Sequence, residues 1–224
     1  MNEALGLLEV VGLTPSLVAL DTMEKSADIS VIQCELNDFY GVCTKIVGTT
    51  EAVKTAIEAG RRAADKMGGS PTADVIPRPD ADAMKALVSP REHNPLIQQD
   101  VVFFPEYASN ENQSTESSNT PSLRAKEGHT MSQSSSFALG LIETQGFTAV
   151  FEAIDTACKA ANVEVIGKEK LGGGYITIIL RGELSAVTAA IEAGKVKVDG
   201  LGKLIAAHVI ARPSPAVLAL LPKP

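Results

Sequence analysis

The chain has 224 residues, a formal net charge of −7 and no tryptophan. This acidic balance argues against a nucleic acid partner, because no cluster of lysine and arginine is available to neutralise a run of phosphates. No stretch approaches the roughly 18 apolar residues of a membrane span, and the start of the chain lacks the basic and apolar regions of a signal peptide. We therefore expect a cytoplasmic protein with neither nucleic acid nor membrane as partner.

The dominant feature of the sequence is an ungapped internal repeat. Ala4–Pro79 recurs as Ala138–Pro213 at a constant offset of 134 positions, with about 30 identities in 76 aligned pairs. A register held over that length indicates duplication of one small domain. We expect a first domain over residues 1–88, a linker over 89–137 and a second domain over 138–224. A domain this small buries only about 60–65% of its unfolded surface, so each copy should gain from packing or oligomerisation.

The first copy alternates strands and helices. Its first apolar run predicts a strand buried on both faces, and Thr14 followed by Pro15 is typical of a helix N-cap and first turn. The next helix has an apolar inner stripe and ends at the pair Gly68-Gly69. The predicted elements are strand Ala4–Val11, helix Pro15–Ser26, strands Ile29–Leu36 and Val42–Val47, helix Thr50–Met67, strand Ala73–Pro77 and a short helix over Asp80–Leu87.

The second copy repeats this order. The predicted elements are strand Ala138–Thr144, helix Ala149–Ala160, strands Val163–Glu169 and Tyr175–Arg181, helix Ala186–Val198, strand Ala206–Ala211 and a short helix Pro215–Leu221 capped by Ser214. The succession β-α-β-β-α-β is the split βαβ, or ferredoxin-like, arrangement. We therefore predict an α+β protein with two tandem ferredoxin-like domains, each followed by a C-terminal helix.

The composition changes between the copies. Residues 89–107 still carry apolar anchors and are expected to lie on the folded surface, whereas residues 108–136 are rich in Ser, Asn, Gln, Thr and Glu. Such a segment has almost nothing to bury and predicts a disordered tether. The aromatic cluster Phe103–Tyr107 either docks a partner or packs across the seam between the copies, and we favour the seam.

No catalytic constellation is visible. The sequence has no Ser–His–Asp or Cys–His arrangement on predicted strand ends and no Walker or dinucleotide loop. The Gly172–Gly174 run joins two strands rather than a strand to a helix, so it lacks the helix N-terminus that would hold an anion. Cys34, Cys43 and Cys158 have no metal-ligand spacing and are typical of small buried residues in a reducing compartment. We predict no enzyme activity, no metal site and no cofactor.

Two further features recur in both copies: a lysine at the end of the first helix, and an arginine after the last strand. In the second copy they accompany the strings ALGLIETQGF, EKLGGGYITIILRGELSAVTAAIEAG and VIARPSPAVLALLP. Together these residues resemble the bacterial microcompartment (BMC) shell proteins. The first copy matches more loosely, through GLLEVVGLTPSLVALDTMEKSAD and IPRP. Because the order of elements is intact in both copies, the chain resembles a tandem BMC protein without circular permutation.

The resemblance implies a homotrimer whose six domains form a pseudohexagonal tile. Such tiles pack edge to edge with other shell proteins around encapsulated enzymes. It implies edge contacts by Lys25, Arg78, Lys159 and Arg212. It also implies that the loop between the second and third strands lines a central pore for small metabolites. The pore-lining residues would be Asn37, Asp38, Phe39, Tyr40, Leu171, Gly172, Gly173 and Gly174.

The two expected pore loops differ in chemistry. Glycines leave room at an axis and let backbone N–H groups face a passing solute, whereas the first copy has the bulky and acidic run Asn37–Tyr40. A trimer would then have a narrowed opening with a ring of Asp38 carboxylates, unless this run is merely an ordinary turn. Some tandem family members bind an iron–sulfur cluster through a cysteine in this loop, but Asp38 holds the aligned position here.

A function from another class is a soluble trimeric sensor. Ferredoxin-like trimers often bind a small ligand between subunits, and a fold by itself never fixes a function. Assembly into sheets or tubes would favour the shell protein. A discrete trimer that binds a small ligand would favour the sensor.

Overall fold

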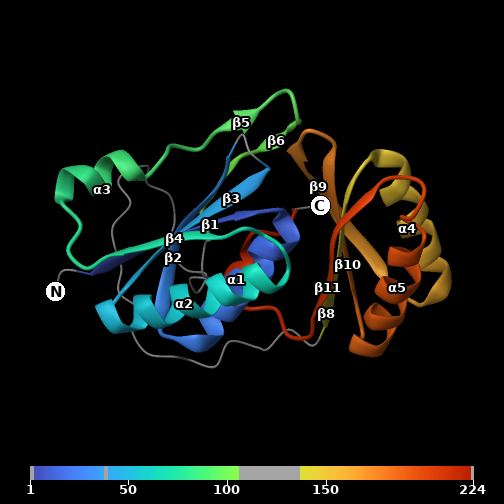
Figure 1. Ribbon diagram of the computed structural model, residues 1–224, viewed down its shortest axis with the longest axis horizontal. Coiled ribbons are helices and arrows are strands. Elements are labelled where there is room, and N and C mark those ends of the chain that lie inside the picture. Colours follow the sequence, from blue (N-terminus) through green and yellow to red (C-terminus); the bar gives the residue numbers. More distant parts are fainter. Residues whose placement is uncertain (1–2, 38–39, 106–136, 223–224) are drawn as a thin grey trace, which may run out of the picture.

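The computed structural model of the chain describes residues 3–37, 40–105 and 137–222, and it arranges them as two α/β units side by side (Figure 1). The first unit consists of β1 (Ala4–Val11), α1 (Leu13–Ser26), β2 (Ile29–Leu36), β3 (Gly41–Gly48), α2 (Thr50–Lys66), β4 (Thr72–Ile76) and then α3 (Ala81–Leu87). The second consists of β8 (Ala138–Gln145), α4 (Phe147–Ala160), β9 (Glu164–Gly172), β10 (Tyr175–Gly182), α5 (Leu184–Val196), β11 (Lys203–Ile210) and then α6 (Pro215–Ala219).

The strand order confirms the ferredoxin-like prediction. The sheet of the first unit runs β4-β1-β3-β2, and that of the second runs β11-β8-β10-β9. Every neighbouring pair within these runs is antiparallel. Each unit is therefore a split βαβ arrangement, in which the third strand lies between the first two strands of the βαβ crossover.

The first helix of each copy begins two residues earlier than the sequence predicts. Gly12 and Gly146 adopt φ values of 91° and 123°, so the chain turns directly from the strand into the helix. Only glycine takes this backbone conformation without strain. The predicted N-cap role of Thr14 is wrong, because Thr14 lies inside α1 and no side chain of the N-cap position caps this helix. Ser214 likewise precedes α6 without a side-chain cap.

The core shows how the two units fit together. The side chains of β8 alternate: Ala138 and Ile142 pack under the helices of the second unit, whereas Leu139 and Leu141 join the core of the first. A strand presents successive side chains to opposite faces of its sheet. The second sheet is therefore covered on one face by its own helices and on the other by the first unit. The covering element is chiefly α1, which contacts β8, β11 and α6 of the second unit.

Part of the linker is folded onto both sheets. It forms the hairpin β5 (His93–Asn94) and β6 (Gln99–Asp100), and then β7 (Val102–Phe103), which pairs with the edge strand β2. The Gln99 side chain bonds the backbone of Lys170 on the outer edge of β9, donating to its carbonyl at 2.6 Å and accepting from its N–H at 2.9 Å. Phe103 packs against the shared core, which agrees with packing at the seam. None of the described helices is long and apolar enough to cross a lipid bilayer.

Candidate functional site

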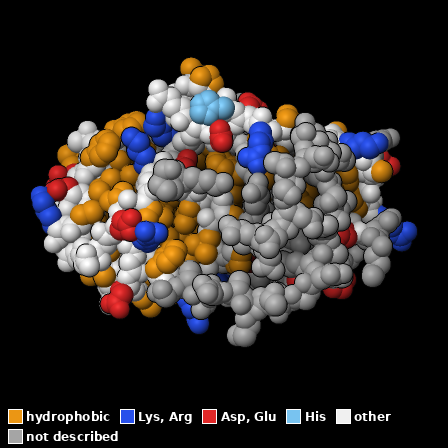
Figure 2. All heavy atoms as spheres, turned by 180° about the vertical axis from the view of Figure 1, so that it is seen from behind, with side chains coloured by type: hydrophobic (Ala, Val, Ile, Leu, Met, Phe, Trp, Pro, Cys, Tyr) orange, Lys and Arg blue, Asp and Glu red, His pale blue; other side chains and the backbone are white. Residues whose placement is uncertain are grey.

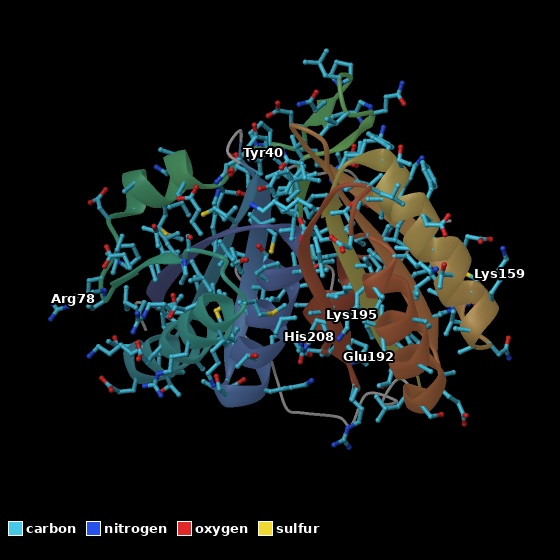
Figure 3. The ribbon with its side chains drawn as sticks, turned by 45° about the vertical axis from the view of Figure 1, so that its right-hand side comes forward. Tyr40, Arg78, Lys159, Glu192, Lys195 and His208 are labelled. Atoms are coloured by element: carbon cyan, nitrogen blue, oxygen red, sulfur yellow. The ribbon has the colours of Figure 1, made fainter. Side chains whose placement is uncertain are left out.

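The two loops expected at a pore lie against each other. The ring of Tyr40, from the β2–β3 loop, stacks on the ring of Tyr175 with centroids 4.7 Å apart and planes within 7°. The same ring covers Gly173 in the β9–β10 turn so closely that a Cβ there would lie 2.2 Å from it. In Figure 3, Tyr40 lies beside the tip of that hairpin. The structure thus brings these two predicted residues together, and only glycine fits at position 173.

Tyr40 and Gly174 occupy equivalent positions in the repeat and share one backbone geometry. Their φ values are 62° and 83°. The carbonyl of Tyr40 accepts a hydrogen bond from Gly12 N–H at 2.7 Å, and that of Gly174 accepts one from Gly146 N–H at 2.9 Å. A tyrosine in the left-handed region is strained by about 1–3 kcal/mol, so the stacking and the hydrogen bond must hold it there.

The surroundings of the remaining predicted pore residues differ. Asn37 begins the first loop, where its Oδ1 accepts from Gly41 N–H at 2.9 Å and its Nδ2 donates to Glu9. Gly172 has open space where a side chain would be. Asp38 and Phe39 lie outside the described residues, so the carboxylate ring stays a prediction.

Leu171 does not fit the expectation of a pore-lining side chain. It is 7% exposed and packs within the shared core. Strand alternation explains this placement, because Leu171 is still in β9 and its side chain points into the seam. The β9–β10 turn therefore offers glycine backbone, and not this leucine, to the solvent.

The four predicted edge residues are exposed at the surface. Lys25 and Lys159 each form an ion pair with an aspartate one turn earlier, Asp21 and Asp155, at 2.5 Å. The hydrogen bond to Asp155 raises the pKa of Lys159, so this side chain stays charged. Arg78 and Arg212 follow the last strand of each unit. Figure 3 shows Arg78 and Lys159 on opposite sides of the protein.

The most buried charge-bearing group of the seam was not predicted from the sequence. Glu143, on β8, is fully buried, and its carboxylate accepts hydrogen bonds from the N–H groups of Leu13 at 2.9 Å and Thr14 at 2.8 Å. These donors are the otherwise unpaired start of α1. Burial raises the pKa of Glu143, while the hydrogen bonds oppose the shift. The helix of the first copy is thus capped by the second copy.

A reciprocal contact lies at the other end of α1. Asp21 accepts a hydrogen bond from Ser214 N–H at 2.8 Å, and Glu24 accepts one from Ala216 N–H at 2.8 Å. These acceptors cap the start of α6, where negative charge also complements the helix dipole. Two carboxylates of α1 and one of β8 therefore tie the two units together through backbone donors.

The two copies differ most in one apolar face, formed by the first helix and the second strand. In the first copy this face is buried, with α1 lying against β8, β11 and α6 of the second unit, whereas its counterpart in the second copy is open. Hydrophobic side chains gather over the second unit in Figure 2. The exposed residues are Phe147 (45%), Phe151 (51%) and Val165 (43%), and their buried counterparts are Leu13 (9%), Leu17 (3%) and Val31 (3%).

A narrow apolar cavity that is partly open to solvent lies at the seam and has a volume of about 20 Å³. It is lined by Leu17, Cys34, Phe103, Glu169 and their neighbours. Burial raises the pKa of the Cys34 thiol to about 12, so this cysteine is a neutral thiol at physiological pH. The described residues contain no cluster of three or more His, Cys, Asp or Glu side chains that could hold a metal ion.

Glu169 differs from its counterpart in the first copy in the side chain opposite it. Its counterpart Glu35 forms an ion pair with Lys45 at 2.6 Å, but the position equivalent to Lys45 is Ile179. Burial, and then the nearby charge of Asp100, raises the pKa of Glu169 to about 7. An acid with a raised pKa stabilises the fold in its protonated form. This contribution is complete below the ordinary value of 4.5 and is lost as the pH rises through about 7.

Glu169→Gln should therefore flatten the pH dependence of stability. The neutral amide avoids burying a charge, so we expect the variant to exceed the original protein in unfolding free energy at pH 8 by about 1–3 kcal/mol. At pH 4 the two proteins should be equal. Urea denaturation at both values measures this difference, with Glu164→Gln, an exposed glutamate of β9, as control. An unchanged pH slope in Glu169→Gln would contradict the expectation.

Comparisons with known proteins converge on one family. The family model for the BMC domain matches residues 4–79 and again 138–213. The chain is similar to the bacterial microcompartment shell protein PduA of Salmonella typhimurium, with 48% identity over 86 residues that span 38% of this chain and 92% of that protein. It is also similar to the carboxysome shell protein CsoS1 of Prochlorococcus marinus, with 52% identity over 77 residues, 34% of this chain and 75% of that protein.

A longer match covers both copies. The carboxysome assembly protein CcmO of Synechococcus elongatus is 33% identical over 205 residues, which span 91% of this chain and 63% of that protein. Among solved structures, a microcompartment protein of Desulfitobacterium hafniense aligns over 96% of this chain and 97% of its own, at 20% identity. The TM-score of 0.35 is too low for this overlay to bear on how the two units are placed.

Proposed function

This chain belongs to the BMC-domain family, and we propose that it is a structural protein of a bacterial microcompartment shell. In this role it forms a homotrimer in the bacterial cytoplasm and has no enzymatic activity. One observation carries the proposal: the second copy exposes the apolar face that the first copy buries against a BMC domain of the same chain. The family membership supports the shell role, and the open face supports further association.

The seam within the chain supports head-to-tail assembly. The helical face of the first copy packs on the sheet of the second, so a single chain leaves one helical face open. The sheet of the first copy is covered only in part, where Leu87 and Ser89 bond the buried side chains of Lys45 and Gln33, and it is open around β1 and β4. On the sheet of the first copy, Leu7, Glu9 and Ile76 are exposed or half-exposed. Their counterparts Leu141, Glu143 and Ile210 are buried. A heterologous contact that repeats the same step closes into a ring when its rotation allows, and three tandem chains would supply six domains.

The proposed tile has edges and a pore. Lys25, Arg78, Lys159 and Arg212 are exposed and are proposed to contact neighbouring tiles, including other shell proteins. The β2–β3 loop, with Asn37, Asp38, Phe39 and Tyr40, would alternate around the pore with the glycines 172–174. The contact between Tyr40 and Gly173 supports this alternation, because it places the two kinds of loop next to each other. Small metabolites would pass through to the encapsulated enzymes.

Electron microscopy of the purified protein tests the shell role. We expect sheets or tubes from the original protein, and loss of these assemblies in Lys159→Asp and in Arg212→Asp. Both variants should remain trimers, because the substituted side chains are exposed and lie outside the apolar face. Lys54→Asp, on the exposed surface of α2, is the matched control for a charge reversal.

A sensor would give a different result in solution. If the original protein stays a discrete trimer at high concentration and binds a small ligand such as a nucleotide or an amino acid, a sensor function replaces the shell proposal. Titration calorimetry with nucleotides and amino acids would detect such binding. Sheets that persist in both charge-reversal variants would remove these residues from the edge.

A further inference from the structure

The cap of α1 within one chain has an equivalent position at α4, which no side chain of the described residues is seen to cap. Both helices have 14 residues, begin directly after a positive-φ glycine, and lack a side-chain cap from their own N-cap position. At α1 the gap is filled by Glu143, whose carboxylate lies against Leu13 N–H and Thr14 N–H. The equivalent donors of α4 are Phe147 N–H and Thr148 N–H. Beside them lies the exposed pair of rings Phe147 and Phe151, 6.3 Å apart.

The equivalent of the capping carboxylate is Glu9. The repeat aligns Glu9 with Glu143 without a gap, and both are the sixth residue of the first strand in their copy. Glu143 is fully buried where it caps α1, whereas Glu9 is exposed on the part of the first sheet formed by β1 and β4. The chain thus contains one completed pair of carboxylate and helix start, and the two halves of a second pair, which lie in different units.

We propose that Glu9 of one protomer caps the start of α4 in the next protomer, accepting hydrogen bonds from Phe147 N–H and Thr148 N–H. This inference rests on the proposed trimer, and it names the polar contact that would sit at the centre of each contact between chains. Three arguments carry it. The same contact is already formed within the chain, its two halves are present and open, and apolar side chains flank the open helix start in the same way.

The proposed cap reaches the pore loop. In the single chain, Glu9 accepts a hydrogen bond from the Nδ2 of Asn37, the first residue of the β2–β3 loop. The counterpart of Asn37 is Leu171, which has no polar group to offer Glu143. Glu9 therefore has a donor from the pore loop of its own copy, and in the proposed contact it gains the helix start of the neighbour as well. When two protomers join, the helix start of the neighbour holds the Glu9 carboxylate in place. Its hydrogen bond from Asn37 then holds the start of the β2–β3 loop.

Dissociation of the trimer on dilution tests the cap. Glu9→Ala leaves two N–H groups without an acceptor at each of the contacts between chains, so we expect the protomer concentration at half-dissociation to rise at least about tenfold. Glu9→Gln should also weaken the trimer, because its amide N–H₂ would face one of the two backbone donors. Glu51→Ala, an exposed glutamate of α2, is the control and should leave the dissociation unchanged.

Amide hydrogen exchange gives a direct readout of the same contact. In the original trimer the amides of Phe147 and Thr148 should be protected like those of Leu13 and Thr14, which Glu143 holds within each chain. In Glu9→Ala only the amides of α4 should exchange faster, so α1 is an internal reference. Exchange is followed at protein concentrations where both proteins are trimeric.

The outcomes separate this inference from the proposed function. An original protein that is not a trimer contradicts the proposed function. A trimeric protein whose dissociation and α4 amide exchange are both unchanged in Glu9→Ala overturns the cap while leaving the shell role intact. If Glu9→Ala fails to fold, Glu9→Gln and the exchange of the Phe147 amide in the original trimer decide the question.

Discussion

Replacing Glu143 with alanine is expected to lower the free energy of unfolding of the whole chain by about 3–5 kcal/mol. The substitution leaves the buried N–H groups of Leu13 and Thr14 without an acceptor, and each unsatisfied group costs about 1–3 kcal/mol. Burial of the carboxylate is itself unfavourable, which is why the pKa of Glu143 is raised. Removing one partner from a buried pair nevertheless destabilises strongly, because the other partner stays buried and unpaired.

Urea denaturation at a concentration where the protein is dissociated measures this loss. Glu143→Gln should fall between the original protein and Glu143→Ala, because one amide oxygen still accepts while the N–H₂ opposes the second donor. Glu9→Ala is the matched control, since its carboxylate is exposed in the single chain and its removal there should change stability by less than about 1 kcal/mol. A loss below that value in Glu143→Ala would contradict the role of the cap.

The repeat and its strand and helix periodicities were sufficient to predict the fold. Both sheets have the expected strand order. The starts of α1 and α4 were placed too late, because the N-cap rule looks for a polar side chain next to the helix. Here Gly12 makes the turn, and the acceptor comes from Glu143, about 130 residues along the chain. No local pattern encodes a cap supplied by another domain.

The candidate site was predictable only in part. The family resemblance led to the two loops, and the structure places Tyr40 against Gly173. The resemblance could not show that the Leu171 side chain would be buried. Strand β9 extends further than the sequence suggests, and the alternation of side chains along it directs Leu171 into the seam. Glu143 is visible in the sequence as an acidic residue in a largely apolar strand, and the first copy has a glutamate, Glu9, at the same position. Its role as a helix cap can be recognised only in the structure, where the start of α1 lies opposite the carboxylate.

Placing two copies in one chain changes what each copy must do. The first copy always has a neighbour on its helical face, so Leu17 is buried as soon as the chain folds. In the proposed trimer the second copy meets its neighbour by collision with another chain, and it offers two phenylalanines where the first copy has leucines. Aromatic side chains are enriched in the buried centres of protein interfaces. The proposed trimer would thus account for this difference between the copies, with a permanent contact for the first and a contact formed on assembly for the second.

Replacing Phe151 with aspartate is accordingly expected to abolish the trimer while the chain still folds. Phe151 is 51% exposed in the single chain, but its counterpart Leu17 is 3% exposed beneath the second unit. A carboxylate at that position would be buried without a partner at every contact between chains, and each such burial costs several kcal/mol. Because three contacts close the ring together, we expect monomers at micromolar concentration by sedimentation velocity.

Leu184→Asp is the control for this last experiment. Leu184, on α5, is also 51% exposed, but its counterpart Thr50 is not buried by the neighbouring unit, so the repeat assigns Leu184 no role in assembly. This variant should sediment as a trimer with the dissociation of the original protein. Trimers of Phe151→Asp with unchanged dissociation would show that the seam within the chain is not repeated between chains, and the head-to-tail ring would have to be abandoned.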